Sequence, residues 1–409
     1  MQLTRLYVKN FGPIKEACVE LGDLTIITGA QNSGKSYLAT LLYALSSELT
    51  DWSYSLPSLL LQEIIEPGIY DANKLQRVKR EKRDSLREVF EVKYKNFITP
   101  DLIQHIIKRA FAREIKEIIR EGSQSMEIGM RDNKVRYQVK IERSIDSLNY
   151  SSLFKVDVDY IISKWINNID TFVVYPDKKG SSTTYKHAYP STLFIPVERL
   201  LILSLFPYTI SYMLEYLTRF GDILSIKAHI SSYLQILQNI LSTTFQYELL
   251  NLGSISIESN APLPITVIRF HDKQRGITVP LHTAASGIIQ LAGIVLPLTR
   301  IINPRLIIIE EPEVNLHADM HITVADYLAE KVAEGRRMVI TTHSEYLLAR
   351  LAQLYAQGRI GDMKAYYIDR RDRVRRLAID KERGEIELPE GIRDAIDTLA
   401  KDAMRLIKV

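Results

Sequence analysis

The chain has very little cysteine and no long uninterrupted apolar run. Its single cysteine, Cys18, excludes an internal disulfide framework and fits a reducing compartment. No apolar segment follows the charged N-terminus, so we expect no secretory signal. Residues 200–214 form a short apolar stretch broken by proline, and polar residues and prolines interrupt residues 276–299, so we expect both to be buried in protein. These features predict a cytoplasmic protein without a membrane partner.

Charge of one sign is not in large excess either. The formal net charge is +4 over 409 residues, which neither requires nor excludes nucleic acid as a partner. The length allows two or three hydrophobic cores, or a single domain with a large insertion. Composition therefore leaves the function to be read from motifs.

The most informative segment present is Gly29-Ala30-Gln31-Asn32-Ser33-Gly34-Lys35-Ser36. It lies between an apolar run at residues 24–28 and a helix-like run at residues 37–42, which is the context of a phosphate-binding loop. Its glycines allow successive backbone N–H groups to turn toward a triphosphate, and the following helix N-terminus adds positive potential. The alternative is an ordinary Gly-Lys-Ser turn. We expect ATP to be bound by the following residues: Gly29, Asn32, Ser33, Gly34, Lys35, Ser36 and Tyr37.

Two roles within this loop follow from its chemistry. The Lys35 ammonium is expected to reach the β- and γ-phosphates and to take part in catalysis. The Ser36 hydroxyl is expected to ligate Mg²⁺, which prefers oxygen ligands.

A second apolar segment, residues 305–309, ends in the acids of Glu310-Glu311-Pro312-Glu313. Carboxylates at the C-terminal edge of a strand beside the phosphate loop hold hydrated Mg²⁺ and orient an attacking water. We therefore predict that Glu310 supports the metal and that Glu311 acts as the general base. The alternative is a strand that runs into an acidic surface turn.

A third apolar segment, residues 338–342, ends at His343. A histidine at a strand end is usually a polar residue near the surface. Because this one follows the acidic strand, we predict that His343 contacts the γ-phosphate or the attacking water.

The chain before the phosphate loop has alternating apolar and polar residues at 3–10 and 17–21, which predicts two strands. From about Asp51 to Arg120 the pattern becomes helical and highly charged. We interpret residues 51–170 as an inserted helical arm that also contains a β-hairpin. The hairpin strands are predicted over residues 126–130 and 135–141.

The ATPase head is then predicted to be split between residues 1–50 and 171–409. Strands and helices are expected to alternate from Leu306 to the end of the chain. Before that point we expect strands near residues 172–175 and 192–195, a helical stretch over about 199–250, and a hairpin formed by residues 265–270 and 276–281.

Taken together, these motifs resemble the ABC-type ATPase heads of the SMC and OLD (overcoming lysogenisation defect) group, and they follow one another in the family's order. The resemblance implies an α/β P-loop NTPase fold with an antiparallel β lobe and an inserted helical arm. The segments that carry it are Asn10-Phe11-Gly12-Pro13-Ile14, the phosphate loop, residues 283–290, Glu310-Glu311-Pro312-Glu313 with Asn315-Leu316-His317, and Thr342-His343-Ser344.

The resemblance also implies an ATP-dependent homodimer. In such proteins two heads close around ATP, so Ser286 and Gly287 of one copy are expected to bind the γ-phosphate held by the other. The residues themselves agree, because Ser286-Gly287 begins an apolar helix whose N-terminus favours an anion. The alternative is an ordinary N-cap serine.

Several differences from related proteins indicate which members of this group the chain resembles. Ile288 replaces a glycine of the transporter signature, which argues against a transporter subunit. Residues 194–199 resemble a Pro-x-Glu-Arg segment of OLD-like proteins, so Glu198 or Arg199 is either a nucleotide sensor or part of a structural ion pair. Fewer than about seventy residues follow His343, too few for the TOPRIM nuclease domain of OLD nucleases. We therefore interpret Asp369 and Asp372 as turn residues.

We predict a Mg²⁺-dependent ATPase whose dimer acts on DNA or on a partner effector, in phage defence or DNA maintenance. The alternative is a low-turnover, ATP-gated regulatory subunit that controls a separate nuclease or toxin. The case for DNA is a basic bias over residues 71–143, which also fits a solvated helical face. The spacing of His317 and His321 indicates no zinc site.

Overall fold

The structure is a computed structural model. It describes residues 3–47, 100–131, 135–143, 148–156, 192–205, 228–241, 244–260, 265–300, 304–369 and 371–389, with a few positions between 393 and 401. Most of the predicted arm, residues 71–99 of its basic stretch and the strand expected near residues 172–175 lie outside these residues. No helix in the described part of the chain has the length and apolarity that a membrane crossing requires.

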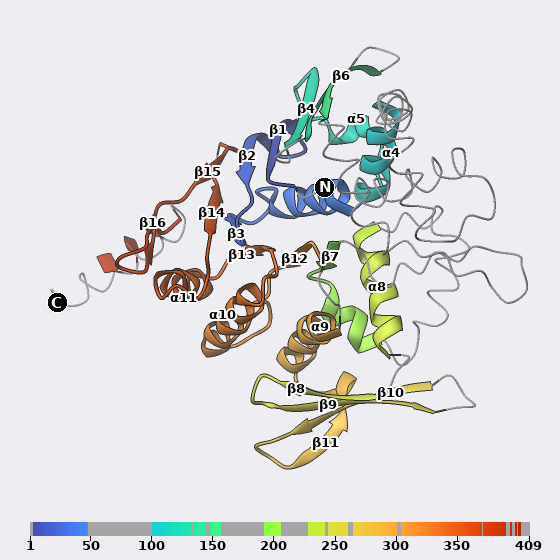
Figure 1. The fold of residues 1–409 in the computed structure, drawn as a ribbon, viewed down its shortest axis with the longest axis vertical. Coiled ribbons are helices and arrows are strands. Elements are labelled where there is room, and N and C mark those ends of the chain that lie inside the picture. Colours follow the sequence, from blue (N-terminus) through green and yellow to red (C-terminus); the bar gives the residue numbers. More distant parts are fainter. Residues whose placement is uncertain are drawn as a thin grey trace, which may run out of the picture.

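A six-stranded sheet forms the centre of the molecule (Figure 1). Neighbouring strands are parallel, except that the edge strand at residues 374–376 runs antiparallel to its neighbour at residues 363–368. The apolar runs at residues 306–309 and 338–340 make the central strands suitable for burial on both faces. Their spatial order is β15 (Val374–Arg376), β14 (Met363–Ile368), β3 (Leu24–Gly29), β13 (Met338–Thr342), β12 (Leu306–Glu310) and β7 (Thr192–Ile195).

Each face of this sheet has its own hydrophobic core. Because side chains alternate along a strand, Ile307 and Ile309 enter one core and Ile308 enters the other. The first core is closed by α8 (Ala228–Leu241), α9 (Ser286–Arg300), α10 (Ala318–Ala333) and α11 (Glu345–Ala356). The second is closed by the helix at residues 35–47 and by the N-terminal lobe, which lies on the opposite side of the sheet in Figure 1.

The N-terminal lobe is an antiparallel sheet, as predicted, and it contains five strands. The hairpin that we assigned to the inserted arm is confirmed as a hairpin, but its first strand pairs with β1 and it therefore extends the lobe. Two short helices, α4 (Pro100–Phe111) and α5 (Ile115–Ile118), lead into it. The strand order is β2 (Ile14–Glu20), β1 (Arg5–Phe11), β4 (Ser125–Arg131), β5 (Val135–Arg143) and β6 (Leu148–Val156).

A third, four-stranded antiparallel sheet packs against α9, and it corrects one prediction. The helical stretch expected to run to residue 250 ends earlier, because Phe245, Tyr247 and Leu249 alternate with polar residues and form a strand. The hairpin predicted at residues 265–281 is confirmed. The order is β11 (Ile277–Pro280), β10 (Ile265–Asp272), β9 (Gly253–Asn260) and β8 (Phe245–Leu249), and the short β16 (Ile379–Asp380) and β17 (Glu385–Ile386) form a separate pair.

The described part of one apolar stretch, residues 200–205, is less buried than expected. Leu201 and Leu205, on the helical residues 199–205, are exposed, whereas Leu203 between them is buried. Residues 276–299 form β11, the short helix Leu281–Thr283 and most of α9, which is exposed at Ser286 and buried from Ile289 to Leu298. The burial expected for this stretch therefore holds for α9, whereas Ile277 on β11 is exposed.

The turn between β1 and β2 joins the lobe to the helix at residues 35–47. Gly12 has a φ of +53°, and a Cβ placed there would come within 2.5 Å of the Tyr37 ring. Tyr37 in turn packs against Phe11 and Phe111, with ring centroids 6.0 and 5.2 Å away. Glycine is thus required at position 12 by its backbone conformation and by the close approach of the ring.

Leu38 provides a test of this packing. It is fully buried on the helix at residues 35–47, so Leu38→Ala should lower the free energy of unfolding by about 2–5 kcal/mol through a cavity. Leu201→Ala is the matched control, since Leu201 is also helical but is 60% exposed. We expect it to change that free energy by less than about 0.5 kcal/mol in urea denaturation. Equal losses in the two variants would contradict the assigned core.

Candidate functional site

The phosphate-binding loop joins β3 to the helix that begins at Lys35. Gly34 has a φ of +102°, and a Cβ there would lie 2.8 Å from Ile14 and 2.9 Å from Pro13. The loop is therefore packed directly on the β1–β2 turn. A side chain at position 34 would be strained and would push the loop away from that turn.

Lys35 is buried within the loop, and its Nζ donates to the carbonyl oxygens of Ala30 at 2.9 Å and Gly29 at 3.3 Å. Burial lowers the pKa of Lys35, although the nearby glutamates oppose that shift. The Ser33 hydroxyl beside it is buried and has no partner within the described residues. A buried cation and an unsatisfied hydroxyl in one loop fit a polyphosphate group.

The acidic strand β12 and the histidine strand β13 end at the same edge of the central sheet as the phosphate loop. On β13, Thr341 is in register with Glu310 of β12, and Thr342 is in register with Thr28 of β3. This corrects one expectation, because β13 lies between β3 and β12 and the acidic strand is not next to the loop's own strand. The register brings Glu311 and His343 together, immediately after the strand ends.

The side chains of Glu311 and His343 face each other, with Oε1 and Nε2 3.4 Å apart. The hydrogen bond from His343 is the main cause of a lowered Glu311 pKa, so this side chain is a carboxylate at neutral pH. Glu311 also has a φ of +42°, a conformation that non-glycine residues adopt at a cost and that concentrates at functional sites. Its N–H donates to the Thr341 carbonyl at 2.9 Å, which holds the unusual backbone in place.

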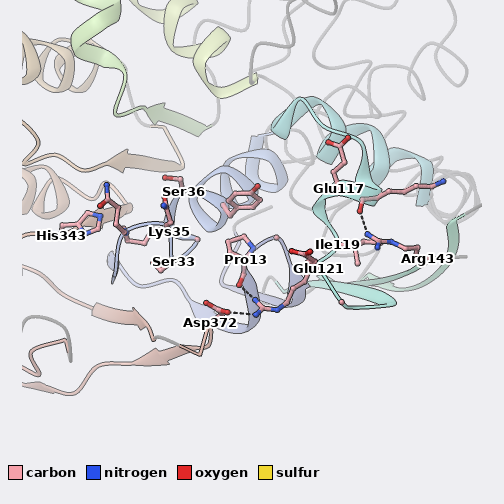
Figure 2. A pocket seen from close by; sticks show the side chains of 18 of the residues that line it. Pro13, Ser33, Lys35, Ser36, Glu117, Ile119, Glu121, Arg143, His343 and Asp372 are labelled. Atoms are coloured by element: carbon pink, nitrogen blue, oxygen red, sulfur yellow. Dashed lines mark hydrogen bonds and ion pairs between the residues drawn. The ribbon is translucent and has the colours of Figure 1, made fainter. Parts of the chain in front are cut away.

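A cavity of about 1210 Å³ lies in front of the phosphate loop (Figure 2). Figure 2 shows Lys35, Ser36 and His343 toward one end of it. The predicted ATP-binding residues Asn32, Ser33, Gly34, Lys35, Ser36 and Tyr37 all line this cavity, together with Glu311 and His343. Gly29 and Glu310 do not line this cavity. Glu310 is buried at the end of β12.

The other side of the cavity is a wall that was not predicted. Arg120 donates to the Pro13 carbonyl and pairs with Asp372 at 2.6 Å. Asp372 lies in the turn between β14 and β15, where Asp369 accepts from the backbone N–H of Arg373, so both aspartates are turn residues as predicted. The wall thus joins the N-terminal lobe to the turn between β14 and β15, at one edge of the central sheet.

Arg199 is fully buried, and it fixes the end of the acidic strand. Its guanidinium donates to the carbonyl oxygens of Glu310 and Glu311, each at 2.7 Å, and of Pro196 at 2.9 Å. Burial lowers the pKa of Arg199 to about 10. Of the two roles left open for this segment, the contacts favour a structural one, although the partners are backbone carbonyls and not the Glu198 carboxylate.

Glu313 was not recognised from the sequence as more than part of the acidic turn. It is buried, and its Oε1 accepts from the Thr342 hydroxyl and from the His343 N–H, both at 2.7 Å. The last acid of the motif therefore holds the backbone of His343. A buried carboxylate needs such donors, but no local pattern names them.

Ser286 is the first residue of α9, as predicted, and it is exposed. Gly287 packs near the segment after the acidic strand, since a Cβ there would lie 3.2 Å from Leu316. Neither residue lines the cavity at the phosphate loop of the same chain.

A phosphate loop with a buried lysine, and an acid and a histidine at the same edge of a parallel sheet, define a P-loop NTPase. The chain belongs to the AAA ATPase domain family, whose model matches residues 1–348 and so includes every one of these motifs. This confirms the prediction of an ATPase-type head. No curated protein matches the chain.

Solved SMC head domains are similar to this chain. One, an SMC head bound to the C-winged helix domain of ScpA, has 13% identity, covers 94% of this chain and 100% of its own, and has a TM-score of 0.45. The SMC head domain from Thermotoga maritima has 12% identity, coverage of 93% and 100%, and a TM-score of 0.39. An Smc head with an extended coiled coil, bound to the C-terminal domain of ScpA derived from Pyrococcus furiosus, has 11% identity, coverage of 98% and 99%, and a TM-score of 0.41.

Arg199→Lys tests the role of the buried guanidinium. Lysine cannot reproduce the planar fork that reaches two carbonyls, so we expect the free energy of unfolding to fall by about 2 kcal/mol. Arg375→Lys is the control, because Arg375 is 40% exposed and pairs with Glu387. That variant should lose less than about 1 kcal/mol by the same urea titration. An unchanged Arg199→Lys protein would show that the fork is dispensable.

Proposed function

We propose that the protein is a Mg²⁺-dependent ATPase whose two copies close around ATP. The observation that carries the proposal is the position of the Glu311–His343 pair, which lines the same cavity as Lys35. A buried ammonium and an ionised carboxylate facing one space are the groups that phosphoryl transfer to water requires.

Each side chain has a distinct role in this proposal. Lys35 neutralises the phosphates, and Glu311 accepts a proton from the attacking water because it is ionised at neutral pH. His343 orients Glu311 through their contact. Ser36, which lines the cavity, and Glu310, which is buried at the end of β12, would hold Mg²⁺ through oxygen ligands of the kind that this ion prefers, and the ion would neutralise phosphate charge there.

The placement of Ser286 supports closure by a second copy. Ser286 is exposed at the N-terminus of a fifteen-residue helix and lies apart from the cavity of its own chain. A helix N-terminus favours an anion, so this end of α9 is suited to the phosphates of another copy's nucleotide. Each site is then completed by the opposite protomer.

We further propose that ATP-driven closure acts on DNA or on a separate effector protein. This extension is supported by the family resemblance of the motifs alone. Turnover measured with and without DNA tests it, because stimulation by DNA favours a DNA substrate. Negligible turnover of an ATP-bound dimer favours the regulatory alternative.

Removal of the base should separate binding from hydrolysis. Glu311→Gln keeps the size of the side chain but cannot accept the proton, so we expect turnover to fall about a hundredfold or more while ATP still binds. The protein with ATP should then elute as a dimer in size-exclusion chromatography with light scattering. Lys35→Ala should lose nucleotide binding itself. Glu258→Gln, an exposed acid on β9, is the control expected to match the wild type. Wild-type turnover in Glu311→Gln would refute the assigned base.

A mixing experiment tests whether the site is shared between copies. Lys35→Ala and Ser286→Arg should each be inactive alone, because one lacks the phosphate-loop lysine and the other blocks the helix end. In a mixed dimer, the intact loop of one copy meets the intact Ser286 of the other, so mixing should restore turnover. If the mixture stays as inactive as its components, each site is built within a single chain.

A further inference from the structure

His321 lies on α10 and contacts two segments, one that follows the acidic motif and one that follows His343. Its Nδ1 is 2.8 Å from the Ser344 hydroxyl, and its Nε2 is 3.3 Å from the Leu316 carbonyl oxygen. Ser344 immediately follows His343, and Leu316 follows the acidic motif. A single imidazole therefore bridges the loop after β12 and the loop after β13.

The chemistry of the partners determines where the protons lie on this ring. The Leu316 carbonyl can only accept, so the proton on Nε2 is donated to it. The Ser344 hydroxyl oxygen already accepts the N–H of Leu347 at 3.1 Å as the N-cap of α11. We therefore assign the Ser344 hydroxyl as donor to the unprotonated Nδ1 of His321. In this tautomer the ring satisfies both loops at once.

On the β13 side, the bridge reaches the backbone that carries His343. The Ser344 N–H donates to the Thr342 hydroxyl at 3.0 Å, and that hydroxyl donates to Glu313 at 2.7 Å. The same Glu313 oxygen accepts the N–H of His343. His321 thus stabilises a chain of hydrogen bonds that surrounds His343 without contacting its ring.

On the β12 side, the bridge reaches the segment beneath Ser286 and Gly287. A Cβ on Gly287 would lie 3.2 Å from the Leu316 side chain and 3.4 Å from the Asn315 carbonyl oxygen. Asn315 has a φ of +59°, so the backbone here is bent sharply. The exposed Ser286 end of α9 therefore packs near Leu316, and the carbonyl of Leu316 is hydrogen-bonded to His321.

We propose that His321 is a positioning residue that couples the Leu316 segment to His343 and thereby sets the rate of ATP hydrolysis. The inference rests on the proposed ATPase function and adds a residue to it. His321 does not line the nucleotide cavity, so its effect reaches the reaction through Ser344 and His343. Its loss should lower turnover and leave ATP affinity unchanged.

Three substitutions divide the two hydrogen bonds. His321→Ala removes both and should lower kcat on the order of tenfold with KM unchanged, as loss of a group behind a catalytic residue does. His321→Asn places an amide oxygen where Nδ1 accepts from Ser344 and should recover most of the loss. His321→Gln places an amide N–H nearer the Leu316 carbonyl and should recover less. Each variant's thermal midpoint is measured alongside, and Asn and Gln keep the test valid if the alanine variant folds poorly.

A double-mutant cycle with His343→Ala distinguishes positioning from general stability. If His321 acts through His343, His321→Ala should have no additional effect on kcat in the His343→Ala protein. Asp326→Asn is the matched control, because Asp326 also joins α10 to α11, through Arg350 at 2.9 Å, but lies outside the His321–Ser344 chain. We expect that variant to keep wild-type kcat.

The outcomes are separable. If the wild-type protein hydrolyses ATP no faster than the Lys35→Ala variant, the proposed function and this inference are both overturned. Normal turnover in His321→Ala, an additive effect in the double mutant, or an equal loss in Asp326→Asn overturns this inference alone and leaves the ATPase proposal standing.

Discussion

The site depends on one buried cation that binds backbone and not a side chain. Arg199 donates to the carbonyl oxygens of Glu310 and Glu311, so it fixes the point at which the acidic strand ends. A buried guanidinium is costly unless its donors are satisfied, and here three carbonyls satisfy most of them. Because Arg199 follows β7, the edge strand beside β12, the fork also holds the edge of the sheet against the site.

A second constraint acts on the neighbouring strand in the same way. Glu313 accepts from the Thr342 hydroxyl and the His343 N–H, so a carboxylate from one loop positions the backbone of the next. The Glu311–His343 contact therefore forms between two backbones that are each held independently. Preorganisation of this kind places charged groups before a ligand arrives, which is how electrostatic stabilisation becomes effective.

Local patterns predicted the elements that carry the chemistry. The phosphate loop, its helix, the acidic strand and the histidine strand are contiguous, and their spacing required no knowledge of distant residues. The errors arose where a short segment was compatible with more than one structure or pairing. Residues 245–249 were placed in a helix although their period is two, and the hairpin at residues 126–141 was assigned to an arm although its first strand pairs with β1.

The sequence by itself determined the class of protein and the motifs that contain Lys35, Glu311 and His343, because these residues lie in continuous segments whose backbone geometry is local. Only the tertiary structure decided that β13 lies between β3 and β12, and hence that Glu311 meets His343. It also decided that Arg199 binds the carbonyl oxygens of Glu310 and Glu311, which lie more than a hundred residues further along the chain. Strand order and register arise from packing of both sheet faces, and no local pattern encodes them.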